Sequence, residues 1–78
     1  MFYVVAKEFS KSRTFTPMQV ASSFDEAREL IAGIEQIFTN SVEEQDRFVD
    51  TAGNLVCDFK AWNGRSGTNF RVTRLLRS

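Results

Sequence analysis

The chain has 78 residues, of which 42% are hydrophobic and eight are phenylalanine, so it is long enough for one folded domain with a small core. Its single cysteine excludes an internal disulfide, and the absence of histidine excludes Ser–His and Cys–His catalytic arrangements and the usual zinc sites. Ten Lys or Arg balance ten Asp or Glu, so the formal net charge is zero.

The positive and negative residues are concentrated in different segments of the chain. Residues 1–22 carry three Lys or Arg against one acid, residues 23–50 carry two against eight, and residues 51–78 carry five against one. If these segments fold onto different sides, the protein has a basic face and an acidic face. Such a distribution steers binding toward a charged macromolecule.

The first residues of the chain favour a cytoplasmic protein. Residues 1–5 are typical of a strand and lack the basic segment and long apolar run of a signal peptide, and no later run is long enough to span a membrane. An unpaired cysteine is typical of a reducing compartment. We therefore expect a complete single domain over residues 1–78, of the kind that small bacterial and phage genes encode.

The N-terminal third predicts two strands and the start of a helix. Residues 2–9 are β-branched and aromatic, which favours a strand. Residues 10–17 are polar and basic and end at the only proline, so we expect a mobile loop or a hairpin arm there, followed by a short strand at 18–21. Ser23 and Glu26 have the spacing of a capping box, which predicts that a helix begins at this point.

An apolar stripe and an acidic arc follow at helical spacing, and they predict an amphipathic helix through about Thr39. The acidic arc faces solvent, and the stripe faces the core. The members of the stripe are Ala27, Leu30, Ile31, Ile34, Ile37 and Phe38.

The C-terminal half predicts three strands separated by turns. Its expected segments are an acidic connection at 40–46, strands at 47–50, 54–62 and 69–76, a type I turn at 50–53 and a Gly-rich loop at 63–68. Cys57 falls on the inward face of the alternating strand, so we interpret it as a core residue.

The predicted order is β-β-α-β-β-β, which favours an α+β fold. One helix cannot cover both faces of a sheet, so we expect a two-layer sandwich with the helix on a four- to five-stranded, mainly antiparallel sheet. The second face of that sheet is then left to solvent or to a partner. Alternation places Lys60, Trp62 and Arg71 on it, with Arg65 beside them.

This basic cluster has three interpretations. Arginine and tryptophan are over-represented at protein-binding hot spots, while aromatic rings among cations are also typical of single-stranded nucleic-acid sites. The third interpretation is a solvated face without a partner. The predicted partner-binding site comprises Lys60, Trp62, Arg65, Arg71 and Arg74, and a direct DNA- or RNA-binding site would use the same five residues.

Acidic residues offer an alternative binding surface. Carboxylates on the helix and in the acidic connection could enter a nucleic-acid-binding groove on another protein; these residues are Asp25, Glu29, Glu43 and Glu44. The acidic connection lacks the spacing of an EF-hand, and the Gly-rich loop lacks the lysine and following helix of a phosphate-binding loop. We therefore expect no catalytic residue, no metal site and no cofactor.

The segment Ala21-Ser22-Ser23-Phe24-Asp25-Glu26-Ala27-Arg28-Glu29-Leu30, together with the Gly-turned hairpin and the basic final strand, resembles the layout of some small phage-encoded anti-CRISPR proteins. The resemblance spans most of the chain as a pattern and transfers no individual functional residue. It implies a non-enzymatic inhibitor that binds a CRISPR effector complex and blocks its target DNA.

The first hypothesis is therefore a small cytoplasmic protein-binding module, encoded by a phage or mobile element, that inhibits a host nucleic-acid-handling complex. The second is a direct nucleic-acid-binding domain. The third is a homodimeric structural or regulatory subunit, formed by strand addition at an exposed sheet edge.

Overall fold

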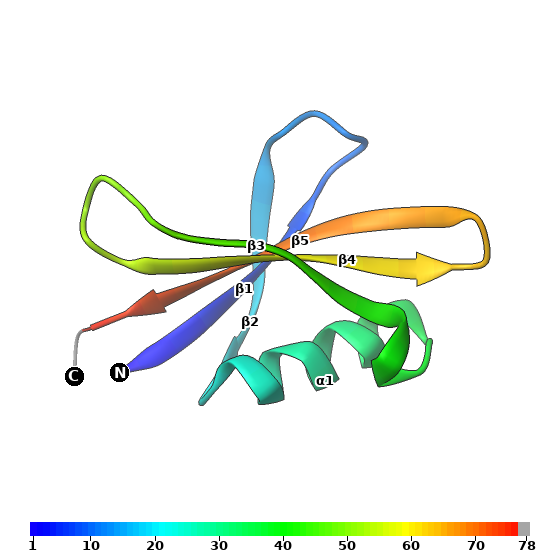
Figure 1. Ribbon diagram of the computed structural model, residues 1–78, viewed down its shortest axis with the longest axis horizontal. Helices are drawn as coiled ribbons and strands as arrows, with labels where there is room; N and C mark the ends of the chain where they lie inside the picture. The colour runs from blue at the N-terminus through cyan, green and yellow to red at the C-terminus, as the bar shows by residue number, and fades with distance from the viewer. Residues whose placement is uncertain (77–78) are drawn as a thin grey trace.

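The computed structural model describes residues 1–76 and packs one helix on one five-stranded sheet (Figure 1). The elements are β1 (Phe2–Glu8), β2 (Phe15–Ala21), α1 (Phe24–Glu35), the 3-10 turn η1 (Thr39–Ser41), β3 (Val42–Val49), β4 (Leu55–Asn63) and β5 (Ser66–Leu75). The predicted α+β layout, with one helix on a β-β-α-β-β-β sheet, is confirmed.

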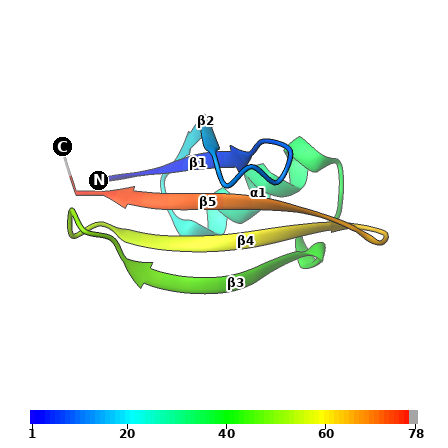
Figure 2. The same cartoon turned by 90° about the horizontal axis from the view of Figure 1, so that it is seen from above.

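The strands lie in the order β2-β1-β5-β4-β3, and every neighbouring pair is antiparallel. Figure 2 looks onto the sheet with α1 behind it. In Figure 1, α1 lies below the sheet, where it contacts all five strands, and the β1–β2 hairpin rises above it. We call the face away from α1 the open face.

The core lies between α1 and the sheet. Ala27 and Ile31 of α1 are fully buried, while Leu30, Ile34 and Ile37 are partly buried at its rim. The sheet contributes side chains that alternate onto the helix side of each strand. The largest of these are Val5, Val42, Cys57, Phe59, Phe70 and Val72.

The helix begins where the capping box predicts. The Ser23 hydroxyl accepts a hydrogen bond from the Glu26 backbone N–H at 3.0 Å. The Glu26 carboxylate turns back and accepts from the N–H and the hydroxyl of Ser22, both at 3.0 Å. The return bonds therefore go to the residue before the cap, and the Ser23 bond satisfies one of the backbone N–H groups that a helix start leaves unpaired.

The helix ends four residues earlier than predicted. Gln36 takes a left-handed conformation with φ of 56°, and the Ile37 N–H donates to the Ala32 carbonyl at 3.0 Å. This closure turns Ile37 back onto the core, as helix endings of the Schellman type do. It also directs Phe38 away from the core, so its assignment to the buried stripe is wrong: Phe38 is 84% exposed.

Both edge strands are longer than the sequence predicts. β2 begins at Phe15, inside the expected loop, because Pro17 is tolerated on an edge strand and next to the irregular pairing at Val5 and Ala6 of β1. β3 begins at Val42, inside the expected acidic connection, because an edge strand accommodates exposed charged side chains that oppose aggregation. The predicted turn at 50–53 is confirmed: the Gly53 N–H donates to the Asp50 carbonyl, and Gly53 has φ of 85°.

Replacing Ile31 with Ala should test the core. Because Ile31 is fully buried, we expect the free energy of unfolding in urea to fall by about 2–5 kcal/mol. Phe38→Ala is the control, because this side chain is mostly exposed, and it should change the free energy by less than about 0.5 kcal/mol. Equal losses in the two variants would contradict the position at which α1 ends.

Candidate functional site

The open face carries a row of residues, one from each strand, across its middle. In sheet order the row is Pro17, Ala6, Arg71, Asp58 and Asp46. Arg71 therefore stands on the central strand β5, with a small side chain on one side and a carboxylate on the other. This arrangement lets the Arg71 side chain reach the neighbouring carboxylate on β4.

Arg71 is held in place by an acid and two aromatic rings. Its Nε donates to Asp58 Oδ1 at 2.8 Å and its Nη2 to Asp58 Oδ2 at 3.1 Å, a bidentate pair. The guanidinium carbon lies 4.5 Å from the ring centroid of Phe15 and 5.6 Å from that of Phe48. Asp58 also raises the pKa of Arg71, so the charge is permanent.

This cluster covers part of the sheet that no helix protects. Ala6 and Val56 belong to the open face, yet they are 8% and 2% exposed. Phe15 and Phe48 come from the two edge strands, β2 and β3, and approach Arg71 on the open face from opposite edges of the sheet. The open face thus has a thin second layer made by its own side chains.

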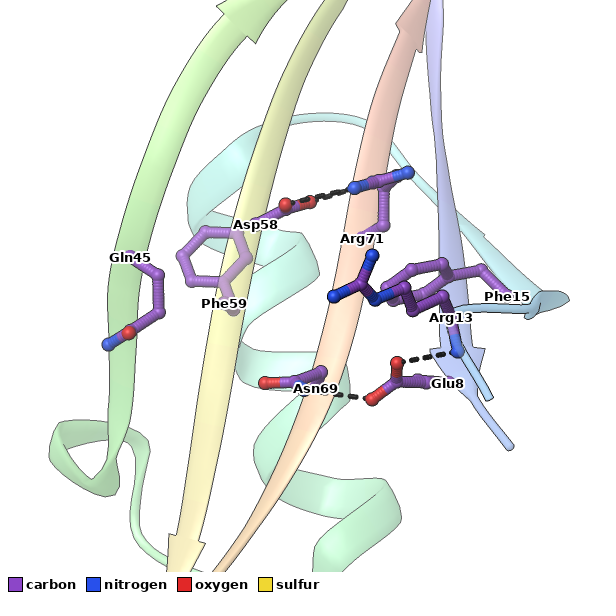
Figure 3. A pocket seen from close by; sticks show the side chains of 8 residues that line it. All are labelled: Glu8, Arg13, Phe15, Gln45, Asp58, Phe59, Asn69 and Arg71. Carbon is purple, nitrogen blue, oxygen red and sulfur yellow. Dashed lines mark hydrogen bonds and ion pairs between the residues drawn. The ribbon is translucent and has the colours of Figure 1, made fainter. Parts of the chain in front are cut away.

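The buried side chain of Glu8 fixes the loop between β1 and β2, which lies beside the Arg71 cluster. Glu8 is 9% exposed, and its two carboxylate oxygens accept from the Arg13 backbone N–H at 2.9 Å and from the Asn69 side-chain amide at 2.8 Å. These groups and Arg71 border a hollow of about 440 Å³. Figure 3 shows the Arg13 guanidinium extending over this hollow beside the Phe15 ring.

Trp62 lies at the end of the open face, beside the β4–β5 hairpin. Lys60 Nζ is 4.8 Å from the Trp62 ring centroid, a cation–π contact. A Cβ at the paired residue Gly67 would lie within 2.4 Å of the Lys60 side chain and 3.1 Å of the Trp62 ring. Glycine at this position therefore makes room for both side chains.

The structure brings three of the five predicted basic-site residues onto the open face: Lys60, Trp62 and Arg71. Arg65 is exposed at the tip of the same hairpin, next to Gly64, whose φ is 65°. Arg74 lies on the helix side, because it pairs in register with Tyr3 and Leu55, and Tyr3 packs on Phe24 of α1. Arg74 therefore cannot share a surface with the other four.

The open face carries both charge signs, which differs from the basic face that the sequence predicts. Asp46 and Asp58 lie in the same row as Arg71, and Glu43 faces Lys60 across the strands. Two of these acids, Glu43 and Asp46, come from the acidic strand β3, which pairs directly with β4, and Asp58 belongs to β4 itself.

The four residues of the alternative acidic surface do not form one surface. Asp25 and Glu29 are exposed on α1. Glu43 and Glu44 are consecutive on β3 and so point to opposite faces of the sheet. Glu44 is paired with Arg47 at 2.9 Å, and that contact lowers the pKa of Glu44.

A second exposed aromatic residue lies near Trp62, and the sequence reasoning missed it. Phe38, Ile37 and Trp62 border a hollow of about 420 Å³ where the end of α1 meets the β4–β5 hairpin. The helical spacing of Phe38 predicts that it belongs to the buried stripe. The helix ends before Phe38, because Gln36 takes a left-handed conformation, and Phe38 is therefore exposed.

No group of three side chains suited to a metal ion occurs within residues 1–76. Over the same range, no helix has the length and apolar character needed to cross a bilayer. The chain matches no known protein family, no curated protein and no solved structure.

The thiol of Cys57 should be inert in the folded protein. Cys57 is fully buried, and burial, followed by the nearby Glu44 carboxylate, raises its pKa from an ordinary 9.0 to about 11. Two pKa units mean about a hundredfold less thiolate at neutral pH. We expect iodoacetamide to label Cys57 only after denaturation. Because the folded-state pKa is raised, the associated stability is complete below pH 9 and is lost as pH rises toward 11.

Removing the Glu8 carboxylate should loosen the β1–β2 loop. Glu8→Ala leaves the Arg13 N–H without its acceptor, so we expect faster exchange of that amide hydrogen and a loss of about 1–3 kcal/mol of stability. Glu8→Gln should retain most of the protection, since one oxygen can accept from Arg13 and the amide can donate to a rotated Asn69. Glu43→Ala, an exposed acid on β3, should leave the Arg13 amide unchanged.

Proposed function

We propose that this protein is a non-enzymatic protein-binding module whose interface is the open face. The observation that carries the proposal is the Arg71 cluster: a guanidinium fixed by Asp58 between Phe15 and Phe48, beside a hollow that α1 does not cover. Arginine and aromatic residues dominate protein-binding hot spots. A side chain that is already fixed loses little entropy when it binds.

Cationic side chains already lie against the aromatic rings of the open face, and this favours a protein partner over nucleic acid. Nucleic-acid sites stack bases on aromatic rings. Here Arg71 lies against Phe15 and Phe48, and Lys60 lies against Trp62, so one face of each ring already carries a cation. The Arg71 charge is also neutralised by Asp58, which leaves less attraction for phosphate. Direct DNA or RNA binding is therefore our second candidate.

We further propose, from the resemblance to small anti-CRISPR proteins, that the partner is a host nucleic-acid-handling complex. In this role a phage or mobile element encodes the protein, and it acts in the bacterial cytoplasm. The exposed Asp25 and Glu29 of α1 support the idea, because carboxylates opposite the bound face repel nucleic acid that approaches the complex.

The two sheet edges disfavour the homodimer by strand addition. Pro17 has no N–H to donate, and the pairing of β2 with β1 is irregular beside it. β3 carries an irregularity between Glu44 and Asp46 and five consecutive exposed residues, of which three are acidic. Such features reduce edge-to-edge pairing.

The test is inhibition of target-DNA binding in a panel of purified CRISPR effector complexes. We expect the protein to inhibit at least one of them, and Arg71→Gln and Trp62→Ala to weaken that inhibition by about thirtyfold, the effect of losing about 2 kcal/mol at a hot spot. Arg47→Gln is the matched control, because Arg47 is also paired with a carboxylate but lies on the helix side of β3.

Three outcomes of this test would contradict the proposal. Inhibition of no complex in the panel would overturn the inhibitor role. Equal loss in Arg71→Gln and Arg47→Gln would move the interface away from the open face. Micromolar or tighter binding of the isolated protein to DNA at about 0.15 M salt would promote the nucleic-acid candidate.

A further inference from the structure

The half of the open face that lies toward the start of β1 and the end of β5 is apolar. Beside the row that contains Arg71 runs a second row, which takes one residue from each strand and has no charged member. Phe2 and Leu75 pair with each other one step farther along and extend this apolar surface (Figure 2). In sheet order the second row, which we call the apolar row, is Val20, Val4, Thr73, Val56 and Phe48.

The protein covers the apolar row only in part. Val56 is buried, whereas Val20 is 60% exposed. The side chains of Val4, Thr73 and Phe48 are half-buried. The α-helix of residues 1–76 packs on the opposite face of the sheet. Apolar side chains that lie together on an uncovered surface are typical of binding sites.

The neighbouring Arg71 row has an excess of negative charge beside the apolar row. Asp58 and Asp46 lie directly opposite each other on β4 and β3, and like charges in this position destabilise a sheet. Arg71 binds both oxygens of Asp58, while no ion pair within residues 1–76 includes Asp46. Asp46 is exposed and can therefore pair with a cation that another molecule supplies.

We propose that the apolar row and Asp46 together bind a basic amphipathic helix of the partner protein. The apolar stripe of that helix lies on the row, and one of its Lys or Arg side chains pairs with Asp46. This inference rests on the proposed protein-binding function and names the element that the partner presents. Charge complementarity at Asp46 selects a basic helix over an acidic one.

A helix suits this surface better than an extended segment does. The backbone groups of the inner strands are paired within the sheet, so the open face offers none of them to an occupant. An extended segment on the apolar row would lose water from its own unpaired backbone groups, which costs free energy. A helix pairs these groups internally, and helices on both faces of a sheet are a common layered arrangement.

A second copy of this chain fits the surface less well. Its helix α1 uses its apolar stripe against its own sheet and exposes Asp25 and Glu29. Those carboxylates would be repelled by Asp46. Two open faces packed on each other would bring a second Asp46–Asp58 pair into the interface and would double the excess of negative charge.

Two designed helical peptides of about 18 residues test the proposal, since this length allows several helical turns. Both have the same leucine stripe, and the polar face carries Lys in one and Glu in the other. In an NMR titration, we expect the Leu/Lys peptide to shift the amides of the apolar row and of Asp46. The Leu/Glu peptide should bind about tenfold more weakly.

Matched variants separate the apolar row from the rest of the surface. Val20→Asn should weaken binding of the Leu/Lys peptide by about tenfold. Val49→Asn is its control: Val49 is 64% exposed and also lies on an edge strand, but on the helix side of the sheet. Asp46→Asn should weaken binding by about fivefold, and Glu29→Gln on α1 is its control. Each control should change the affinity by less than about twofold.

Equal affinities of the two peptides, or equal losses in Val20→Asn and Val49→Asn, would overturn the inference. The panel of effector complexes separates this failure from failure of the protein-binding function. Inhibition that Arg71→Gln weakens, but that Val20→Asn and Asp46→Asn leave unchanged, would retain the function and reject the inference. A dimer in sedimentation that Val20→Asn dissociates would make a second copy the occupant. Binding to phosphatidylcholine vesicles that Val20→Asn abolishes would make the occupant a lipid surface, and either result would likewise overturn the inference.

Discussion

The structure depends on one constraint: a single helix must stabilise a five-stranded sheet. The helix α1 has twelve residues and contacts all five strands on one face of the sheet. Nothing in residues 1–76 is left to cover the other face. In a chain of this size that face must be either polar or protected by its own side chains.

The Arg71 cluster is how this protein meets the constraint. The charge of the guanidinium is matched by Asp58, and the group lies 4.5 Å and 5.6 Å from the ring centroids of Phe15 and Phe48. These side chains form a layer over the open face, where Ala6 and Val56 are almost fully buried. The same features that cover the open face also leave an arginine and aromatic rings fixed at its surface, so the proposed binding would use the residues that cover this face.

The fold was predictable because its signals are local. The helical stripe, the capping box and the alternation from Leu55 to Ala61 each need only neighbouring residues, and together they locate Lys60 and Trp62 on the open face. The Arg71–Asp58 pair had a usable signal as well. Once Gly64 and Arg65 are recognised as a two-residue turn, counting outward along both strands pairs Asp58 with Arg71.

The rest of the site had no local signal. Phe15 stands in a polar, basic stretch around the only proline, and its role appears only when β2 pairs with β1. Glu8 ends a strand and would be expected to face solvent, yet it is buried because the β1–β2 loop folds back onto it. Phe38 matched the helical period but follows a left-handed residue that is not glycine. Each miss is a case in which tertiary contacts override the local preference.

The placement of charge explains why the net charge of zero is informative. Strand β3 places Glu43 and Asp46 beside β4, whose own charged residues are Asp58 and Lys60, so the open face carries both charge signs. A uniform polyanion would be attracted by the cations of this face and repelled along the row of Asp58 and Asp46. A protein surface with mixed charge can satisfy both regions at once. Mixed charge on this face therefore favours the proposed protein partner over nucleic acid, and it follows from the order of the strands.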